Sequence, residues 1–545
     1  MTPPAEMAGS APLIAALRDP ARHPDAVTHI DVLETHISWV VLTGRHAYKI
    51  KKPVNLGFLD FSTLEARRRY CEEELRLNRR LAPSLYETLV KITGSADNPC
   101  IVDDEADASD HATAIEYAVR MREFPQSALA GRLLADGALS AAHIDALAAR
   151  IAAFHAETGI AAHGCPYGMP EAVVVPAREN FVELDRLLPD TVDQTRIAEL
   201  RTWTEHEYRA RQALFGARHT QGCVRECHGD LHLGNIVMLD GVLTPFDCIE
   251  FNPALRWIDV MNEVAFLVMD LMDRQRADFA YRFLNAYLEA SDGYAGLEVL
   301  RFYLVYRATV RAKIHGLRAA QNDIATTERE RLMAASRGYI ELAQRCAVGK
   351  HCARPALMVM HGLSGSGKSV IAHTLAERIG AIRLQSDIER KRIGCLEPLA
   401  RSGSKLTSGI YTEDLTRATY HRLLDLARMA TNAGYAVVVD ATFLKRWQRD
   451  LFRREADAHG IPLIIVHVTA PEAVLRTRIA ARLAARGDSS EADQAVLTHQ
   501  LVQREALSNE ELQGSLHLDT TRVDFETTLR EACATLRMRL ISPEL

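Results

Sequence analysis

The chain has 545 residues, a length that corresponds to several domains and allows large hydrophobic cores. Hydrophobic residues make up 48% and charged residues 25%, which is the composition of a globular protein and excludes a disordered or fibrous chain. The 65 Lys and Arg against 71 Asp and Glu leave a formal net charge of −6. A generally basic surface is therefore excluded, and we expect no general nucleic-acid binding.

The sequence favours a cytoplasmic location with no membrane partner. It contains no apolar run of about eighteen residues, the length that a membrane-spanning helix requires. The N-terminal residues lack the basic start and long apolar core of a secretory signal. The 10 cysteines are scattered without a repeating framework, as expected of reduced thiols.

The first part of the chain predicts a small, mostly antiparallel sheet with one helix. Residues 37–54, ISWVVLTGRHAYKIKKPV, place β-branched and aromatic residues on both sides of a turn at 44–46, which indicates two paired strands. A charged helix is expected at 64–81. Further strands are expected at 86–94 and 111–125.

From about residue 127 the hydrophobic periodicity becomes helical. In residues 140–158, SAAHIDALAARIAAFHAET, apolar residues recur every three and four positions. Helices are expected up to about residue 346, with an interruption at 235–247, where two short strands flank an Asp-Gly turn. The pattern predicts a sheet lobe followed by a larger helical lobe.

The last third of the chain has a different pattern, in which continuous apolar strands alternate with helices. The strands are expected at 356–362, 381–385, 435–441 and 462–470. This alternation predicts a parallel sheet covered by helices on both faces. We therefore predict an α+β domain over 1–345, a linker over 346–354 and an α/β domain over 355–545.

The segment GLSGSGKS, residues 362–369, matches the phosphate-binding loop G-x-x-x-x-G-K-[ST] and stands between an expected strand and an expected helix. Its glycines allow backbone N–H groups to converge on phosphates, and the helix N-terminus adds positive potential. We expect Lys368 to reach the β- and γ-phosphates of ATP and Ser369 to hold Mg²⁺. The other expected cradle residues are Gly362, Ser364, Gly365, Ser366 and Gly367.

Two carboxylates follow strands of the same expected sheet. Asp440 ends the strand YAVVVD, a position suited to support the metal. Asp387 follows the strand AIRLQ, at the edge where ligands of open α/β sheets gather, and there it can accept the proton of an attacking hydroxyl. The alternative for Asp387 is a helix cap. The basic residues 390–392 that follow could hold an anionic acceptor.

Arginines recur every four residues after the strand 462–470, so Arg478, Arg482 and Arg486 could share one helix face. Such a row is either a solvated helix face or a lid that neutralises charge in a phosphoryl transfer. With GLSGSGKS, SDIERKR and VVVDAT, this lid makes residues 355–545 resemble the P-loop kinases related to polynucleotide kinase, gluconate kinase and zeta-toxin proteins. The resemblance implies ATP-dependent phosphorylation of a hydroxyl, with Asp387 as the base.

A second candidate site lies at residues 228–252, HGDLHLGNIVMLDGVLTPFDCIEFN. Asp230 and Asn235 reproduce the D-x-x-x-x-N spacing of a kinase catalytic loop, and Asp247 follows the expected hairpin, where a second metal carboxylate is expected. A phosphoryl transfer needs a carboxylate that orients or deprotonates the hydroxyl and ligands for Mg²⁺, and these three residues could supply them.

A kinase-like site also needs a strand lysine and a helical glutamate. Lys49 and Lys51 point to the same side of one expected strand. We favour Lys49, because it directly follows an apolar pair, and keep Lys51 as the alternative. Among the three consecutive glutamates of the expected helix, Glu74 shares the apolar stripe of that helix with leucines three and seven residues later.

HGDLHLGN, FDCIEFN and the run LRWIDVMNEVAFLVMDL make residues 27–344 resemble the aminoglycoside phosphotransferase family, which has a bilobal, kinase-like fold. The resemblance implies that Asp230 is the catalytic base and that Asn235 and Asp247 bind Mg²⁺. It also implies that His228 and Asp259 support the catalytic loop structurally. The chain departs from protein kinases, because VLETHISW stands where a G-x-G-x-x-G loop would precede Lys49. Protein-kinase activity is therefore disfavoured.

The spacing of the histidines and cysteines gives less support to a transition-metal site. His228 and His232 are four residues apart, but the glycines at 229 and 234 argue against the helix that would pair them. The group of Cys223, Cys227 and His228 lacks the paired spacings of a zinc site, and so does the group Cys346, His351 and Cys352.

The sequence thus predicts a tandem phosphotransferase that uses ATP and Mg²⁺ in both domains, with hydroxyl-bearing acceptors that it does not identify. Two alternatives remain open. The first domain could be a regulatory pseudokinase that controls a C-terminal ATPase or kinase. The protein could also be a toxin-like kinase acting on a nucleotide sugar or an RNA end.

Overall fold

The computed structural model describes residues 5–25, 27, 29–55, 57, 59–103, 113–321, 324–349, 354–396, 409–485 and 492–541. By residue contacts the chain divides into two compact units. Unit 1 comprises residues 1–147, 154–173 and 213–267, and unit 2 comprises 148–153, 174–212 and 268–545. None of the helices in the described ranges combines the length and apolar character needed to cross a bilayer.

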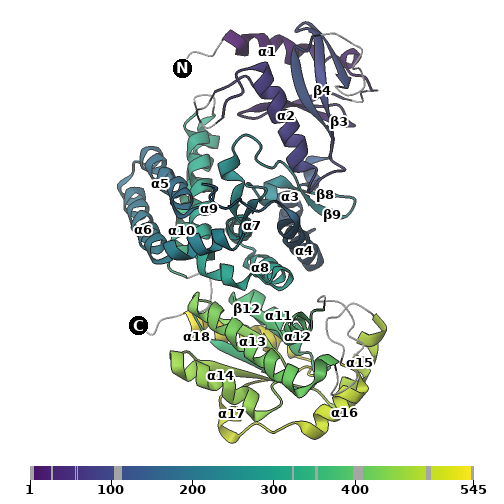
Figure 1. The fold of residues 1–545 in the computed structure, drawn as a ribbon, viewed down its shortest axis with the longest axis vertical. Coiled ribbons are helices and arrows are strands. Elements are labelled where there is room, and N and C mark those ends of the chain that lie inside the picture. Colours follow the sequence, from purple (N-terminus) through teal and green to yellow (C-terminus); the bar gives the residue numbers. More distant parts are fainter. Residues whose placement is uncertain are drawn as a thin grey trace. The chain divides into compact units, whose positions relative to one another are not determined.

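Unit 1 contains a six-stranded antiparallel sheet in the order β1-β2-β3-β6-β4-β5 (Figure 1). Its strands are β1 (Asp31–Glu34), β2 (Ser38–Leu42), β3 (His46–Lys51), β4 (Tyr86–Ser95), β5 (Asn98–Asp103) and β6 (Glu116–Arg122). The predicted strands around the turn at 44–46 are confirmed as β2 and β3. The edge strands β1 and β5 were not predicted, because their sequences carry little apolar alternation.

Helices cover both faces of this sheet. On one face, Leu13 of α1 (Ala5–Ala16) and Leu17, directly after this helix, pack with Trp39, Tyr48 and Ile92. On the other face, α2 (Leu64–Asn78) contributes Cys71 and Leu75 to a second core. The helix α2 begins as predicted, because the side chain of Thr63 accepts a hydrogen bond from the Ala66 N–H. It ends three residues before the predicted end.

The rest of unit 1 is built around two small two-stranded sheets. The hairpin β8 (Ile236–Leu239) and β9 (Val242–Pro245) confirms the strands predicted around the Asp-Gly turn. The strands β7 (Val224–Glu226) and β10 (Trp257–Asp259) form the second pair. The helix α3 (Ala130–Ala135) belongs to this unit, and α4 (Ala141–Glu157), α5 (Pro170–Leu187), α6 (Thr191–Thr220) and α7 (Val260–Asp273) contribute residues to both units.

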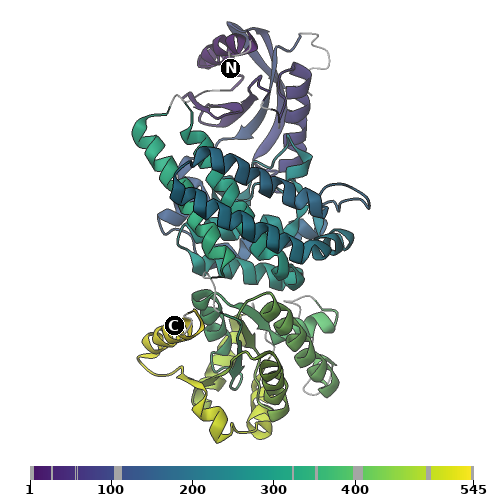
Figure 2. The ribbon, with the colours of Figure 1, turned by 90° about the vertical axis from the view of Figure 1, so that its left-hand side faces the viewer.

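Unit 2 contains a group of long helices and a parallel sheet. The helices α8 (Ala277–Ser291), α9 (Leu297–Ala319) and α10 (Thr326–Ala347) follow one another, and α9 and α10 pack along their lengths (Figure 2). They confirm the predicted helical character up to about residue 346. The predicted linker lies partly outside the described residues, and the predicted domain boundaries stay a prediction.

The parallel sheet has five strands in the order β12-β13-β11-β14-β15. Its strands are β11 (Leu357–His361), β12 (Ile382–Gln385), β13 (Val437–Asp440), β14 (Leu463–Thr469) and β15 (Leu516–Asp519). The helices in the same part of the chain are α11 (Lys368–Ile379), α12 (Ser386–Ile393), α13 (Glu413–Asn432), α14 (Arg446–His459), α15 (Glu472–Ala485), α16 (Gln494–Gln503), α17 (Asn509–Gln513) and α18 (Phe525–Ile541). The first four strands confirm the predicted parallel sheet. The edge strand β15 was not predicted.

Three histidines form a ladder across this sheet. His361, His467 and His517 occupy paired positions on β11, β14 and β15, with ring centroids 4.8 and 5.0 Å apart. His361 is buried, and neither of its ring nitrogens has a hydrogen-bond partner within the described part of the chain. Burial, with the neighbouring His467 and Arg449, lowers the pKa of His361 to about 3.

We predict that His361 makes the protein acid-sensitive. Its pKa is about 3 in the folded state and 6.5 in the unfolded chain, so its contribution to stability is complete above pH 6.5 and is lost as the pH falls towards 3. At pH 5 the loss is about 2 kcal/mol. Thermal unfolding followed from pH 8 to pH 5 should show a shallower pH dependence for His361→Leu than for wild type.

The exposed His421 of α13 provides the control, and thermal unfolding of His421→Leu should follow the wild-type pH profile. Equal slopes for wild type and His361→Leu would contradict the prediction.

Candidate functional site

The first candidate site centres on a lysine of β3 that contacts two carboxylates. The Lys49 Nζ lies 2.7 Å from the Glu74 Oε1 of α2 and 2.5 Å from the Asp247 Oδ1 that follows β9. Burial lowers the pKa of Lys49, but the charges of Asp247 and Glu74 outweigh it and hold the pKa well above its ordinary value. The structure thus brings together three of the side chains that the sequence singled out.

Lys51, the alternative lysine, uses the other oxygen of the same glutamate. Its Nζ lies 2.7 Å from the Glu74 Oε2, forms an ion pair with Glu250 and lies 5.0 Å from the ring centroid of Phe61. The side chains of Lys51 and Glu74 are fully buried, whereas the side chain of Lys49 is 12% exposed. A ligand can therefore reach Lys49 more readily than Lys51.

The predicted catalytic loop is held by its own side chains. The Asn235 Nδ2 donates to the Asp230 Oδ2 at 2.8 Å and to the Asp230 carbonyl at 3.1 Å. The His232 Nδ1 accepts the Gly234 N–H at 3.0 Å, so its Nε2, 3.4 Å from the Asp230 Oδ2, carries the proton. His232 therefore stabilises the turn of the loop and lies beside Asp230.

The catalytic loop and the segment that carries Asp247 are joined through Phe246. The Phe246 N–H donates to the Asn235 carbonyl at 2.9 Å, and the His228 Nε2 lies 2.8 Å from the Phe246 carbonyl. Asp247 itself has a φ of 64°, and its N–H donates to the Tyr86 hydroxyl at 3.1 Å. These bonds bring the candidate base and the candidate metal ligands into one region.

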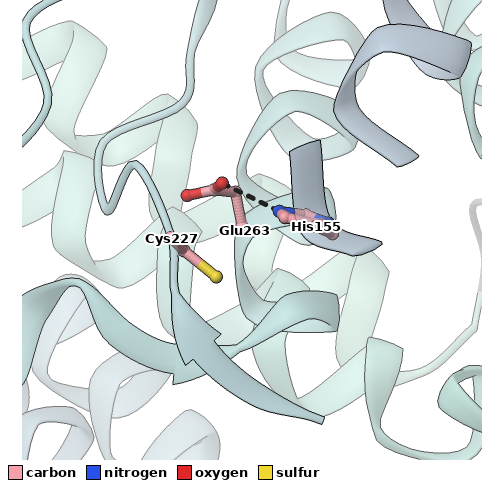
Figure 3. A group of neighbouring side chains, drawn as sticks. All are labelled: His155, Cys227 and Glu263. Carbon is pink, nitrogen blue, oxygen red and sulfur yellow. Dashed lines mark hydrogen bonds and ion pairs between the residues drawn. The ribbon is translucent and has the colours of Figure 1, made fainter. Parts of the chain in front are cut away.

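A buried glutamate of α7 fixes the start of the catalytic loop. The carboxylate of Glu263 accepts the N–H groups of His228 at 3.1 Å and Gly229 at 2.7 Å, and it lies 2.9 Å from the His155 Nε2. Figure 3 shows Glu263 and His155 facing each other, with the Cys227 thiol beside them. Burial would raise the pKa of Glu263, but the bonds from His155 and Gly229 lower it to about 2.

His155, Cys227 and Glu263 also form the one group of three potential metal-ligating side chains within 4.8 Å of one another in the part of the chain that the structure describes. The Glu263 carboxylate already accepts three hydrogen bonds there, and the Cys227 thiol faces the Ile258 carbonyl at 3.5 Å. The arrangement therefore supports the catalytic loop without a metal.

Asp259 has a structural position, as the family resemblance implied. The Arg218 guanidinium binds its two oxygens at 2.6 and 2.8 Å, and one of these oxygens accepts the Met261 N–H at 2.9 Å. The buried Arg218–Asp259 pair thus anchors the first turn of α7, the helix that carries Glu263.

The second candidate site is the loop between β11 and α11, residues 362–369. The Lys368 Nζ donates to the Leu363 carbonyl at 2.7 Å, so the lysine folds over its own loop. The Ser369 hydroxyl donates to the Asp440 Oδ1 at 3.2 Å. The structure therefore brings the predicted phosphate lysine, metal serine and metal carboxylate together at the carboxyl ends of β11 and β13.

Two positions of this loop require glycine, because their positive φ angles and close neighbours disfavour a side chain. Gly365 has a φ of 82°, and a Cβ there would lie 2.9 Å from the Leu475 carbonyl. Gly367 has a φ of 96° and occupies the N-cap of α11. These positions place the loop backbone close to α15 and open the helix N-terminus for an anion.

Other elements hold the loop from outside. The Ser364 N–H donates to the Gln500 Oε1 of α16 at 2.9 Å. The Thr520 hydroxyl lies 3.0 Å from the Ser366 carbonyl, and Arg478 donates to that hydroxyl at 2.7 Å. Arg478 thus contacts the phosphate loop through Thr520.

The charged groups of the second site shift one another's pKa values. Burial lowers the pKa of Lys368 to about 8, while Asp440 and Asp387 oppose the shift. Burial raises the pKa of Asp440, and Arg383 and Lys368 oppose it. Asp387 is the second residue of α12, whose N-cap is Gln385, so Asp387 is not the helix cap.

The remaining basic candidates are bound to protein oxygens. Arg482 donates to the Ala492 carbonyl at 2.6 Å. Arg390 donates to the Ile410 carbonyl at 3.2 Å and to the Thr416 hydroxyl at 3.0 Å, and Arg392 pairs with Glu389. Lys391 is buried. The side chains at 390–392 are thus engaged within the fold rather than displayed towards an acceptor, and Arg486 lies outside the described residues.

Both sites have the chemistry that Mg²⁺ and a nucleotide require. In the second site the buried Asp440 Oδ2 and Ser366 Oγ have no hydrogen-bond partner in the described ranges, and both are oxygens of the kind that Mg²⁺ or a phosphate-bound water prefers. In the first site Asn235 and Asp247 offer oxygens as well. Asp440 with Ser369, and Asp247 with Asn235, are therefore the residues that would hold the metal.

Sequence reasoning missed several of these contributors. His155, Gln500 and Thr520 lie outside any motif, and Glu263 lies in the run LRWIDVMNEVAFLVMDL without having been assigned a role. Each acts through contacts between elements far apart in the chain. A signal was available for Glu263, because it is a charged residue within the apolar run of α7. Glu250, within the segment FDCIEFN, was assigned no role from the sequence, and the structure pairs it with Lys51.

Comparisons with known proteins agree with both halves of this arrangement. The model of the "Phosphotransferase enzyme family" matches residues 61–303, and that of the "AAA domain" matches 357–507. Uncharacterized protein Rv2004c of Mycobacterium tuberculosis (strain ATCC 25618 / H37Rv) is 31% identical over 462 residues, which cover 85% of this chain and 88% of that protein.

Two gluconokinases are similar to smaller parts of the chain. The enzyme of Gluconobacter oxydans (strain 621H) is 29% identical over 130 residues, 24% of this chain and 66% of its own. A crystal structure of a gluconokinase from Sinorhizobium meliloti 1021 matches at 25% identity and a TM-score of 0.25, covering 34% of this chain and 95% of its own.

We predict that Glu263→Gln destabilises unit 1 by about 3 kcal/mol, because an amide nitrogen then faces buried N–H donors that lose their acceptor. The variant should also lose activity that depends on Asp230, since the backbone before Asp230 is no longer fixed. Chemical denaturation measures the first effect. The exposed Glu65→Gln is the control, and an unchanged midpoint for Glu263→Gln would contradict the prediction.

The two lysines of β3 should respond differently to the same substitution. Lys51→Met should cost about 3–5 kcal/mol of unfolding free energy, because Glu74 and Glu250 lose the cation that they share. Lys49→Met should mainly weaken nucleotide binding, measured by calorimetry in a Lys368→Ala background. Arg331→Met, at an exposed ion pair with Glu328, is the control. If Lys51→Met remained stable and bound nucleotide more weakly than Lys49→Met, the roles assigned to the two lysines would be reversed.

Proposed function

Because this chain belongs to the same family as its mycobacterial relatives and joins an aminoglycoside-phosphotransferase-like domain to a P-loop kinase domain, we propose that it is a tandem ATP- and Mg²⁺-dependent phosphotransferase. Each domain transfers the γ-phosphate of ATP to a hydroxyl group of a small molecule or of a nucleotide-type acceptor. A cytoplasmic location, where ATP is available, is part of this proposal.

The contact of Lys49 with both Glu74 and Asp247 is the observation that carries the proposal for the first domain. A lysine that has to hold phosphates needs a carboxylate to orient it and must lie beside the metal carboxylate. Lys49 meets both conditions and is partly accessible, whereas Lys51 is enclosed by Glu74 and Glu250. We therefore assign phosphate binding to Lys49 and a supporting role to Lys51.

In the first domain Asp230 accepts the proton of the acceptor hydroxyl. Its side chain is 36% exposed, so an acceptor can reach it, and Asn235 orients its Oδ2. Asn235 and Asp247 would hold Mg²⁺, and the bound Mg²⁺·ATP supplies the phosphoryl group and neutralises its charge. Glu263 keeps the backbone before Asp230 in place, which supports catalysis by positioning.

In the second domain Lys368 holds the phosphates, and Ser369 and Asp440 hold the metal. Asp387 accepts the proton of a second acceptor, and its influence on the pKa of Lys368 supports a position near the phosphates. Arg478 acts as the lid arginine, because it contacts Thr520 and through it the phosphate loop. Arg482 is the second lid candidate, with a smaller role, since its guanidinium is bound to the Ala492 carbonyl.

The two active sites can be separated by substitution. We expect Asp230→Ala and Asp387→Ala each to abolish a different set of phosphorylated products, by at least about a hundredfold, because each removes the proton acceptor of one site. The measurement is transfer from labelled ATP into a metabolite extract, with Lys368→Ala as the variant that removes the second site altogether.

Asp31→Ala, at a well-exposed carboxylate, is the control and should retain all products. If Asp230→Ala changes no product while Lys368→Ala removes all transfer, the first domain is a regulator and not an enzyme. If neither variant loses any transfer, the tandem phosphotransferase is excluded. Transfer only to nucleotide sugars or RNA ends would favour the toxin-like alternative.

A further inference from the structure

A buried arginine of the edge strand β12 lies next to the candidate metal carboxylate of the second site. The Arg383 Nη1 is 4.0 Å from the Asp440 Oδ2, which has no hydrogen-bond partner within the described ranges. Arg383 is the first of the two cations that favour the charged form of this buried carboxylate. It lies close enough to stabilise the charge of Asp440 but too far away for a hydrogen bond to occupy the oxygen.

What holds Arg383 at this distance is a glutamate of α8, in the same compact unit. The Arg383 Nε and Nη2 donate to the two oxygens of Glu289 at 3.0 and 3.1 Å. Its Nη1 faces the His373 Nδ1 at 3.0 Å, and its Nη2 the Gln385 Oε1 at 3.3 Å. A two-pronged arginine–carboxylate pair fixes both the position and the orientation of the guanidinium.

Helix α8 also forms hydrogen bonds with the main chain at Arg383 and Ala381. The Arg383 N–H donates to the Asn285 Oδ1 at 2.7 Å, and the Asn285 Nδ2 donates to the Ala381 carbonyl at 3.0 Å. Asn285 therefore satisfies two backbone groups at the outer edge of β12, the last strand on this side of the sheet in the described part of the chain. One helix thus fixes both the main chain and the side chain of Arg383.

We infer that Glu289 is a positioning residue for the nucleotide site of the P-loop domain, acting through Arg383 on Asp440. Glu289 neutralises Arg383, so the guanidinium does not close on Asp440 and the carboxylate stays available to Mg²⁺. The inference rests on the proposed function only in taking Asp440 as a metal ligand. It also means that residues 355–545 do not contain everything that this site needs, because Glu289 lies upstream.

The expected consequence of losing Glu289 follows from the cost of an unpaired buried charge. Without the carboxylate, Arg383 is buried with Asp440 as a nearby anion, and the two should form a direct ion pair. That pair would occupy the oxygen that Mg²⁺ requires. Binding of Mg²⁺-nucleotide should then weaken, while binding of the nucleotide without Mg²⁺ should not change.

The test is calorimetric binding of AMP-PNP to the full chain, with and without Mg²⁺, in an Asp247→Asn background that removes the metal carboxylate of the first site. We expect Glu289→Gln to weaken Mg²⁺-dependent binding about tenfold and to leave Mg²⁺-free binding unchanged. Glu289→Asp should recover part of the affinity. The double variant Glu289→Leu with Arg383→Leu should bind better than Glu289→Gln, because no cation remains to close on Asp440.

The matched control is Asp278→Asn, which weakens the ion pair of α8 with Arg276 at 2.8 Å, at the other end of the helix from Glu289. It should bind Mg²⁺-nucleotide like the parent. Parent-like binding by Glu289→Gln, or equal weakening by Asp278→Asn, would overturn the inference. Failure of Lys368→Ala to weaken binding would instead refute the proposed P-loop site, so the two failures can be told apart.

Discussion

The first site depends on one buried carboxylate shared between two lysines. Glu74 is fully buried and binds Lys49 with one oxygen and Lys51 with the other, and burial of such a charge is tolerated only when it is paired. Lys51 in turn pairs with Glu250, three residues beyond Asp247. The chain of charges therefore connects β3, α2 and the segment after β9, so the geometry of the site follows from the need to neutralise Glu74.

The second site also contains a buried carboxylate that nearby cations neutralise. Asp440 is buried at the end of β13, and Arg383 and Lys368 are the cations that favour its charged form. Arg383 is itself balanced by Glu289, as Lys51 is balanced by Glu250. In both sites a second ion pair, Lys51–Glu250 or Arg383–Glu289, therefore lies next to the charged group that we propose contacts the ligand. We propose that this second pair controls whether that group is available for binding.

Motifs made most of the fold and the central residues predictable. GLSGSGKS combines a backbone requirement with a charge, and its position between strand and helix is encoded locally. The D-x-x-x-x-N spacing and the hairpin after it are local as well. The edge strands β1 and β5 were not predicted, although each pairs with the adjacent strand along the chain, because their sequences carry little apolar alternation. The edge strand β15 pairs with β14, which is distant in sequence.

By itself the sequence determined the two fold classes, the phosphate loop and the residues of the catalytic loop, because these depend on local spacing and periodicity. Only the tertiary structure decided that Lys49 is the accessible lysine and Lys51 the enclosed one, that Glu263 holds the catalytic loop, and that Glu289 balances Arg383. The physical reason is that the burial and pairing of a charge depend on which distant elements pack around it. Spacing along the chain carries no information about that environment.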